Sequence, residues 1–334
     1  MITSKRNYDL TSHNTFRMKA KCDEWIEYDS RDDIPALAGM TAGRRVMHIG
    51  GGSNLLFVRD FDGVVLHSLI HDVSWNDCGD TVRVRAGSGV ALDDLIAESV
   101  RRGLWGLENL SAIPGEVGAS AVQNVGAYGV EAGDVIETVG CYDTAERRFV
   151  TVPASQCEFA YRHSIFKRPD VKGRYIVADV TFRLSRVPDP KLDYGRLGEH
   201  LVRGGVSPDD VRKAVIAVRS AKLPSVTEYG SAGSFFKNPV VSREVYEAIS
   251  GDKAVPHYPA EGGVKIPAAW LIEQCGWKGY EQNGVAVWDR QPLIIVNKSG
   301  EASAADVLDV ESRIVASVAG RFGIELHPEV EHIF

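Results

Sequence analysis

A single stretch of the sequence decides how the rest is interpreted: it reads IPGEVGASAVQNVGAYG and occupies residues 113–129. It has four glycines within 15 residues and almost no charge. It is too long for one turn, and its backbone N–H and C=O groups must find partners. A large ligand with polar edges would supply them. A buried Ω-loop is the structural alternative.

A second glycine segment precedes it. Residues 45–49 are strand-like and run into Gly50-Gly51-Gly52-Ser53-Asn54. Glycines let backbone N–H groups approach an anion closely, so this loop is a candidate binding site for a diphosphate. It is not a P-loop, because no Gly-Lys-Ser/Thr follows, and the apolar residues after it predict a strand rather than the helix of a dinucleotide-binding Rossmann turn. A tight turn is the alternative.

The pattern around these segments predicts an α+β protein. Residues 55–58, 64–66 and 81–85 are strand-like, and residues 135–152 predict a hairpin around Asp143–Glu146. Apolar residues at helical spacing predict a helix that starts at Leu92 and stops at Gly103. Ser207 and Ser303 each have the features of an N-cap residue and predict two later helices, the last ending at Gly323.

Composition restricts the function classes. The 334 residues are 44% hydrophobic and 25% charged, as expected of a globular protein with two or three domains. The net charge of −7 argues against a nucleic-acid partner that needs a broad basic face. No apolar run is long enough for a membrane helix, and no secretory signal is visible.

The cysteines and histidines give no sign of a metal site. The five cysteines are scattered and form no C-x-x-C pair, which favours reduced thiols in the cytoplasm. The nine histidines show no zinc-type spacing, so no metal is expected.

Three shorter motifs carry reactive side chains. Residues 161–164 join Tyr161 and Arg162, with a surface turn as the alternative. Residues 233–239 place Ser234 beside two aromatic rings without the G-x-S-x-G pattern of an acyl nucleophile, which favours a proton donor. Residues 327–330 carry Glu329 near the end of the chain, where a strand end is the alternative.

Together these segments resemble the UDP-N-acetylenolpyruvoylglucosamine reductase (MurB) family. The resemblance extends over nearly the whole chain, in the order of the family's motifs. The matching segments are residues 14–16, 51–54, 113–115 continuing through 123–129, 161–164, 222–224, 233–239 and 328–330.

The resemblance implies a two-part FAD-binding domain of the vanillyl-alcohol-oxidase (PCMH) type, followed by a C-terminal α+β substrate-binding domain. The expected boundaries are 1–70, 71–206 and 207–334. The implied reaction uses non-covalent FAD and NADPH in ping-pong order to reduce UDP-N-acetylglucosamine enolpyruvate to UDP-N-acetylmuramate, for peptidoglycan synthesis. A cytoplasmic monomer, or at most a weak dimer, without membrane or nucleic-acid partners is expected.

The resemblance also assigns residues. Ser234 would donate the proton, while Arg162 and Glu329 would polarise the substrate carboxyl group and stabilise the developing charge. Tyr194 would be the lid tyrosine of the longer subtype. The remaining substrate-side matches are Lys222, Asn238, Tyr258, Lys278 and Gln291. The cofactor-side matches are Gly50, Gly51, Gly52, Ser53, Asn54, Ile113, Pro114, Gly115, Gly118, Gln123, Asn124, Gly126, Ala127 and Tyr161.

Two positions depart from the family pattern, and the end of the chain is short. His163 stands where Asp is at least as frequent, and Glu331 stands where some members carry Arg. Few residues follow Glu329, so little of the core is expected to depend on them. A chain that ends at Pro328 is therefore predicted to fold and to retain its flavin.

Two other functions are open from the sequence. An oxidase of the same fold, acting on a sugar or lactone, often ties its flavin covalently to a histidine, but neither glycine segment contains one. A non-catalytic nucleotide-binding module would have no need of the proton donor Ser234.

Overall fold

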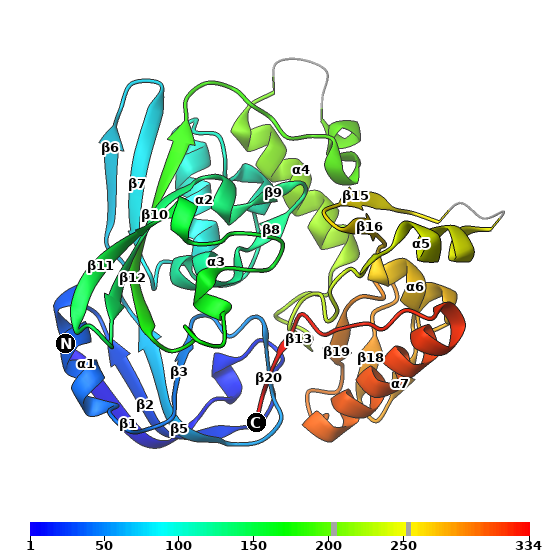
Figure 1. Ribbon diagram of the computed structural model, residues 1–334, viewed down its shortest axis with the longest axis horizontal. Helices are drawn as coiled ribbons and strands as arrows, with labels where there is room; N and C mark the ends of the chain where they lie inside the picture. The colour runs from blue at the N-terminus through cyan, green and yellow to red at the C-terminus, as the bar shows by residue number, and fades with distance from the viewer. Residues whose placement is uncertain (202–205, 252–254) are drawn as a thin grey trace. The chain divides into compact units, whose positions relative to one another are not determined.

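The computed structural model describes residues 1–201, 206–251 and 255–334 (Figure 1). These residues form two compact units, and each unit draws on segments that are distant in sequence. Unit 1 comprises Met1–Tyr8, Cys22–Gly51 and Asp62–Arg219, and unit 2 comprises Asp9–Lys21, Gly52–Phe61 and Ser220–Phe334. The chain passes from unit 1 to unit 2 within the predicted glycine loop at residues 50–54.

These units differ from the boundaries expected at residues 70 and 206. Helix α4 (Pro208–Lys222) belongs to unit 1 as far as Arg219. Its buried face packs with Trp105 and Leu197 in one apolar cluster. Residues near the N-terminus join unit 2 instead, where the Thr15 hydroxyl donates to the Ser231 carbonyl oxygen at 2.6 Å and the Ser231 amide donates back to Thr15. The expected domain boundaries at residues 70 and 206 both stay predictions.

Unit 1 is built on two sheets, although a few of their strands end at a residue that belongs to unit 2. The first has the strand order β1-β2-β5-β3, with β3 parallel to β5, and the second has the order β11-β10-β12-β7-β6, antiparallel throughout. A short pair, β8-β9, is separate. The strands are β1 (Ile2–Asp9), β2 (Lys21–Tyr28), β3 (Val46–Ile49), β5 (Phe61–Ser68), β6 (Val73–Asp77), β7 (Thr81–Gly87), β8 (Gly126–Ala127), β9 (Val130–Glu131), β10 (Ile136–Asp143), β11 (Arg148–Pro153) and β12 (Tyr175–Ser185).

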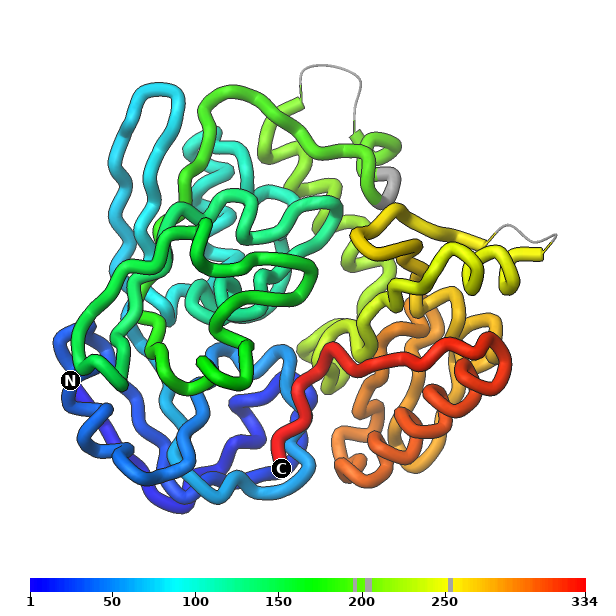
Figure 2. Tube along the Cα trace, viewed as in Figure 1, coloured from blue at the N-terminus to red at the C-terminus, as the bar shows by residue number. Residues whose placement is uncertain are grey.

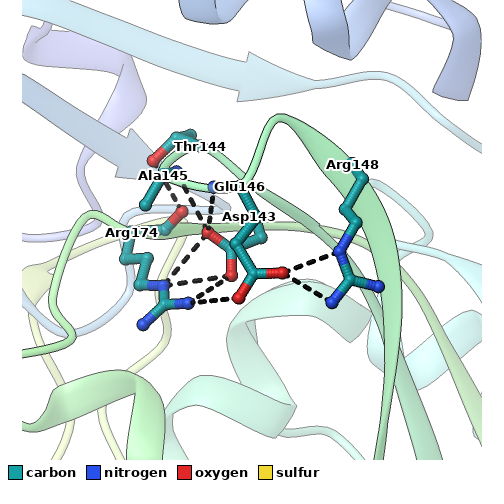
Figure 3. Close-up of polar contacts among 6 residues, drawn as sticks. All are labelled: Asp143, Thr144, Ala145, Glu146, Arg148 and Arg174. Atoms are coloured by element: carbon teal, nitrogen blue, oxygen red, sulfur yellow. Dashed lines mark hydrogen bonds and ion pairs between the residues drawn. The ribbon is translucent and has the colours of Figure 1, made fainter.

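The hairpin predicted around Asp143–Glu146 is confirmed by β10 and β11 (Figure 3). The Asp143 carboxylate accepts hydrogen bonds from the backbone N–H groups of Ala145 and Glu146, at 3.0 and 3.2 Å. It also binds the Arg174 guanidinium at 2.6 Å. One buried aspartate therefore closes the turn and connects it to the segment that precedes β12.

The helices of unit 1 are α1 (Ile34–Met40), α2 (Leu92–Arg101), α3 (Val117–Gln123) and α4, with 3-10 turns η2 (Arg31–Asp33), η3 (Glu108–Leu110), η4 (Ala132–Asp134), η5 (Ala154–Gln156), η6 (Ile165–Lys167) and η7 (Tyr194–His200). Helix α2 confirms the predicted helix, and Gly103 follows it in the left-handed conformation, with φ +70°. The Ser207 hydroxyl accepts the Asp210 amide at 3.2 Å, as expected of the N-cap of α4.

Residues 113–129 are more regular than the sequence predicts. They contain helix α3 and strand β8, so much of their backbone is satisfied within the protein rather than by a ligand. Small residues allow this compactness, because the Cβ that a larger residue would place at Gly118 lies 2.8 Å from Ser88 Cβ. Neither a ligand-bound loop nor an Ω-loop describes the whole segment.

The described residues of unit 2 form three small sheets, with orders β13-β19-β18-β17, β14-β16-β15 and β20-β4. The strands are β4 (Leu55–Phe57), β13 (Gly230–Ser231), β14 (Val240–Val241), β15 (Tyr258–Ala260), β16 (Gly263–Lys265), β17 (Glu281–Gln282), β18 (Val285–Val287), β19 (Ile295–Asn297) and β20 (Glu331–Ile333). The helices are η1 (Thr11–His13), α5 (Arg243–Ser250), α6 (Ala268–Gln274) and α7 (Ala304–Phe322). Helix α7 confirms the predicted last helix, with Ser303 and Asp306 forming a capping box and Gly323 at φ +64°.

The end of the chain is not peripheral, and the expectation that little core depends on it is wrong. Strand β20 lies parallel to β4, in the register Glu331↔Leu55 (Figure 2). Val330 is 2% exposed and Ile333 6% exposed, so both are core residues. A local sequence pattern carries no signal for pairing between segments that are far apart in sequence. For this reason the sequence predicted that few core residues follow Glu329.

Candidate active site

The two predicted glycine segments meet inside unit 1. A Cβ added to Gly51 would lie 3.3 Å from the Cα atom of Gly115, so the two backbones touch without side chains between them. A Cβ on Gly50 would lie 3.3 Å from Ala119 Cβ. Among the described residues, no hydrogen bond uses the N–H groups of Gly51 or Gly115. Backbone donors that no other described residue uses suit anionic oxygens, so these residues fit the diphosphate of FAD.

The remainder of the first glycine loop lies in unit 2 and is fixed there. Gly52 has φ +59°, and a Cβ at this position would come within 2.0 Å of the His13 carbonyl oxygen, so only glycine fits. The Asn54 side-chain amide donates to the Glu329 carbonyl oxygen at 3.1 Å, and the Asn54 carbonyl accepts the Glu331 amide at 2.9 Å. A predicted cofactor residue thus holds the backbone of a predicted catalytic residue.

Several predicted cofactor residues also have structural roles. Asn124 adopts φ +44°, and its amide bonds Glu131 at 2.7 Å, Ala160 at 2.9 Å and the Gly133 N–H at 2.8 Å. Gln123 accepts a hydrogen bond from Lys167 Nζ at 2.7 Å. These contacts fix the end of α3. That Asn124 and Gln123 bind the cofactor stays a prediction, and the same holds for Ser53, Ile113, Pro114 and Ala127.

The Arg162 turn lies against β8 in unit 1. Ala160 and His163 exchange backbone hydrogen bonds, and Arg162 between them takes the uncommon left-handed conformation, with φ +55°. Its Nη2 donates to the Gly126 carbonyl oxygen at 2.9 Å, and its guanidinium carbon lies 5.1 Å from the Tyr161 ring centre. The turn and the glycine segment therefore orient Arg162 together. The neighbouring His163 closes the turn through its backbone hydrogen bonds with Ala160.

Ser234 and Glu329 lie on neighbouring segments of unit 2. Phe236 and Pro328 form an antiparallel bridge, and the Glu329 amide donates to the Phe235 carbonyl oxygen at 2.8 Å. The Ser234 side chain is half-buried, between the exposed Gly233 and the fully buried Phe235. The fold thus brings together two predicted catalytic residues that are far apart in sequence.

The predicted substrate residues are spread over both units. Tyr194, in η7 of unit 1, is 41% exposed, and its Cβ lies 3.3 Å from the position of a Cβ on Gly129. In unit 2, the Lys222 carbonyl accepts the indole N–H of Trp288 at 3.0 Å, and Asn238 accepts the Ala268 amide at 2.9 Å. Tyr258 is 41% exposed in β15.

Lys278 and Gln291 are the two remaining substrate-side residues. Lys278 pairs with Glu273 at 2.7 Å on the surface, and the Gln291 carbonyl accepts the Ile294 amide at 3.0 Å. Neither contact indicates a ligand, so both assignments rest on the resemblance alone.

One polar cluster beside the glycine segments is not evident from the sequence. His67 lies between Glu116 and Glu27, with its Nε2 3.1 Å from Glu116 Oε1 and its Nδ1 3.5 Å from Glu27 Oε1. Burial lowers the pKa of His67, but the hydrogen bonds and charges of Glu116 and Glu27 outweigh burial and raise it above its ordinary value. The available signal was Glu116 itself, the one charged residue in residues 113–129.

Two further properties bear on function. None of the helices in the described part of the chain combines the length and apolar character needed to cross a lipid bilayer. In residues 1–201, 206–251 and 255–334, no three His, Cys, Asp or Glu side chains are arranged to hold a metal ion.

Comparison with known proteins identifies the family. Residues 26–147 match the FAD binding domain, and residues 225–333 match the C-terminal domain of UDP-N-acetylenolpyruvoylglucosamine reductase. The reductase of Bacteroides fragilis is 45% identical over 98% of this chain and 100% of its own length, and that of Porphyromonas gingivalis is 42% identical over 98% and 99%. The crystal structure of the Thermus caldophilus reductase matches 99% of this chain and 98% of its own with a TM-score of 0.68 at 22% identity, which supports the fold. The predicted fold class is confirmed, and the chain belongs to the UDP-N-acetylenolpyruvoylglucosamine reductase family.

Proposed function

We propose that this protein reduces UDP-N-acetylglucosamine enolpyruvate to UDP-N-acetylmuramate, with FAD as cofactor and NADPH as the source of electrons. The observation that carries the proposal is the full-length identity of 45% to a reductase of that name. Two electrons and a proton move as hydride to the methylene carbon of the enolpyruvyl group, and a second proton goes to the adjacent carbon. Both product C–H bonds are thereby accounted for.

The backbone of the two glycine segments would hold the FAD diphosphate, with Gly51 and Gly115 as donors. When bound, FAD supplies the two-electron chemistry that takes hydride from NADPH and passes it to the substrate. The protein supplies orientation around it. Tyr161, at the Arg162 turn, would contact the cofactor from the same unit.

Ser234 would donate the second proton, from its hydroxyl to the carbon next to the substrate carboxyl group. A serine hydroxyl is a weak acid, so the donation depends on stabilising the charge that develops on the substrate. Antiparallel pairing with residues 327–329 fixes the backbone on which Ser234 lies. Its position is therefore set by the core of unit 2 rather than by a mobile loop.

Arg162 and Glu329 would act on the substrate carboxyl group and the enolate-like charge. The bond to the Gly126 carbonyl orients Arg162, and the five N–H donors of a guanidinium, set in a fixed fork, match the geometry of a carboxylate. Lys222, Asn238, Tyr258, Lys278 and Gln291 would bind the nucleotide sugar, and Tyr194 would cover it.

The same proposal includes the cellular context. The substrate is a small nucleotide sugar and the reductant is the soluble cosubstrate NADPH, which fits a reaction in the cytoplasm. We propose that the protein works there as a monomer in peptidoglycan precursor synthesis. Size-exclusion chromatography coupled to light scattering would test the monomer.

A deuterium-labelling experiment tests the reaction. Purified protein, NADPH and the enolpyruvyl nucleotide sugar are incubated in deuterated water, and the product is analysed by mass spectrometry and NMR. We expect NADPH oxidation that depends on the sugar nucleotide, with solvent deuterium at the carbon next to the carboxyl group. NADPH oxidation that proceeds equally without the sugar nucleotide, with oxygen as acceptor, would indicate an oxidase instead.

A further inference from the structure

His67 lies in a polar cluster within the first sheet of unit 1. Its side chain is 15% exposed, and those of Glu116 and Glu27 are 15% and 22% exposed. Glu27 comes from β2, His67 from β5, and Glu116 from the residue before α3. The Trp25 ring lies 5.1 Å from the imidazole and limits its access to water. Carboxylates so shielded from water need compensation by a cation or by hydrogen bonds.

Glu116 lies directly beside the predicted diphosphate donors. It follows Gly115, and a Cβ on Gly50 would lie 3.1 Å from its Oε2 and 3.4 Å from its Cβ. A negative carboxylate at this place repels an anionic ligand held by Gly51 and Gly115. A protonated His67, 3.1 Å from the other carboxylate oxygen, offsets that repulsion.

We propose that His67 is a positioning residue for the cofactor, whose imidazolium form holds and neutralises Glu116 so that the glycine segments bind the FAD diphosphate. This inference rests on the proposed function, because it concerns the same cofactor. It makes FAD affinity depend on the protonation of one residue, His67.

The direction of the pH dependence follows from the neighbours of His67. The facing ionisable groups are Glu27 and Glu116, which raise its pKa above the ordinary value of 6.5, while burial opposes them. Tyr28, which also senses the charge of Glu116, has a pKa raised to about 12 by burial and stays neutral. The imidazolium form is therefore favoured at low pH and is lost as the pH rises through the raised pKa. FAD affinity is expected to fall with it.

The test uses apoprotein, prepared by removing the flavin, and titrates it with FAD while flavin fluorescence is recorded between about pH 6 and about pH 9. For wild type, the dissociation constant is expected to rise about tenfold across this range. His67→Gln, which keeps a hydrogen-bonding group but cannot be protonated, is expected to bind weakly at every pH. His71→Gln is the matched control, because His71 is an exposed histidine just after β5, and it should behave as wild type.

A second variant separates charge from packing. Glu116→Gln removes the repulsion, so its FAD affinity is expected to be high and independent of pH. The double variant His67→Gln/Glu116→Gln is expected to recover the affinity that His67→Gln alone loses. A purely structural role of His67 would leave the double variant as weak as the single one and would overturn the inference.

Two measurements test the inference even if a variant fails to fold: the pKa of the His67 ring and the pH dependence of FAD binding in wild type. If His67→Gln does not fold, the pKa of the His67 ring is measured by NMR titration in wild type and in Glu116→Gln. The pKa is expected to be lower in Glu116→Gln than in wild type. An equal pKa in the two proteins would overturn the inference. A wild-type protein that binds FAD with the same affinity at all these pH values would also overturn it, with the proposed function intact. A wild-type protein that takes up no FAD would overturn both.

Discussion

The glycine segments of unit 1 and the Ser234–Glu329 region of unit 2 are held in opposite ways. In unit 1, Gly51 and Gly115 touch because side chains are absent, and a carboxylate lies beside them. In unit 2, residues from the middle and the end of the chain are joined by backbone pairing, and their neighbours Phe235 and Val330 are core residues. Changes in the first region should therefore act on cofactor binding, and changes in the second on folding and on the substrate half-reaction.

The largest expected effect comes from removing the end of the chain. A protein ending at Pro328 loses strand β20 and the buried Val330 and Ile333. Burying such side chains contributes about 1.5–3 kcal/mol each, so about 3–6 kcal/mol is lost, a large fraction of the roughly 5–15 kcal/mol that stabilises an ordinary domain. We predict loss of cooperative thermal unfolding for unit 2, measured by calorimetry.

A chain that ends at Ile333 is the matched control, because Phe334 is 52% exposed and β20 is retained. It should unfold close to wild type. A Pro328-terminated protein with the wild-type unfolding temperature would show that the β20–β4 pairing contributes little.

Ser234→Ala is expected to have the next largest effect. Flavin reduction by NADPH needs no protonation of the substrate and should stay near the wild-type rate. Reoxidation by the enolpyruvyl sugar should slow about 10²–10⁴-fold, because general acid catalysis is lost. Stopped-flow absorbance at the flavin band measures both steps, with Ser312→Ala on the exposed side of α7 as control. Equal slowing of both steps would point to a role in folding or binding.

Glu329→Gln should have a somewhat smaller effect on the same step. It removes a charge but keeps the backbone bonds to Phe235 and Asn54. Loss of one electrostatic partner of the transition state costs about 10²–10³ in turnover. Glu325→Gln, an exposed residue just before, is the control. Wild-type reoxidation in Glu329→Gln would assign a purely structural role to Glu329.

In unit 1, Gly51→Ala should weaken the cofactor rather than the chemistry. The new Cβ would lie 3.3 Å from Gly115 Cα, so the two segments must move apart by a few tenths of an ångström. We predict about tenfold weaker FAD binding, as expected when a close backbone approach is lost. Gly39→Ala is the control, because a Cβ there meets nothing within 4 Å. A wild-type FAD dissociation constant in Gly51→Ala would remove this contact from the cofactor site.

The smallest predicted effect lies away from both regions, at the Asp143 turn. Hydrogen bonding to Arg174, helped by two backbone N–H groups, lowers the pKa of Asp143. Its contribution to stability is present above the ordinary carboxyl pKa and is lost as the pH falls through the lowered one. Asp143 is 2% exposed and Arg174 38% exposed, so water screens only one partner, and Asp143→Asn should cost about 1 kcal/mol at neutral pH. The difference from wild type should vanish in acid, and a difference that persists there would implicate packing instead.

Local sequence signals predicted the helices and turns that depend on neighbouring residues. They did not predict the structure that depends on pairing between distant segments. The hairpin at Asp143, helix α2 and the capping box at Ser303 each depend on neighbours in sequence, and each is confirmed. Strand β20 depends on β4, which is far away in sequence, so the sequence offered a strand end near Glu329 only as an alternative and gave no sign of its partner. Helix α3 was missed for another reason: glycine and small residues weaken the helical pattern while they permit tight packing.

Some residues of the candidate site could likewise be predicted from the sequence, and others could not. The resemblance supplied Ser234 and Glu329, and the fold explains how they come together through residues 235 and 328. It gave no hint of His67, because Glu27, His67 and Glu116 come from three separate elements. No local pattern links such residues until the sheet is formed.

The most direct measurement is the absorbance spectrum of the purified protein under anaerobic conditions. We predict a yellow protein whose colour is released on denaturation as FAD, is bleached by NADPH and is restored by UDP-N-acetylglucosamine enolpyruvate. A flavin that NADPH does not bleach, or one that stays bleached after the enolpyruvyl sugar is added, would contradict it.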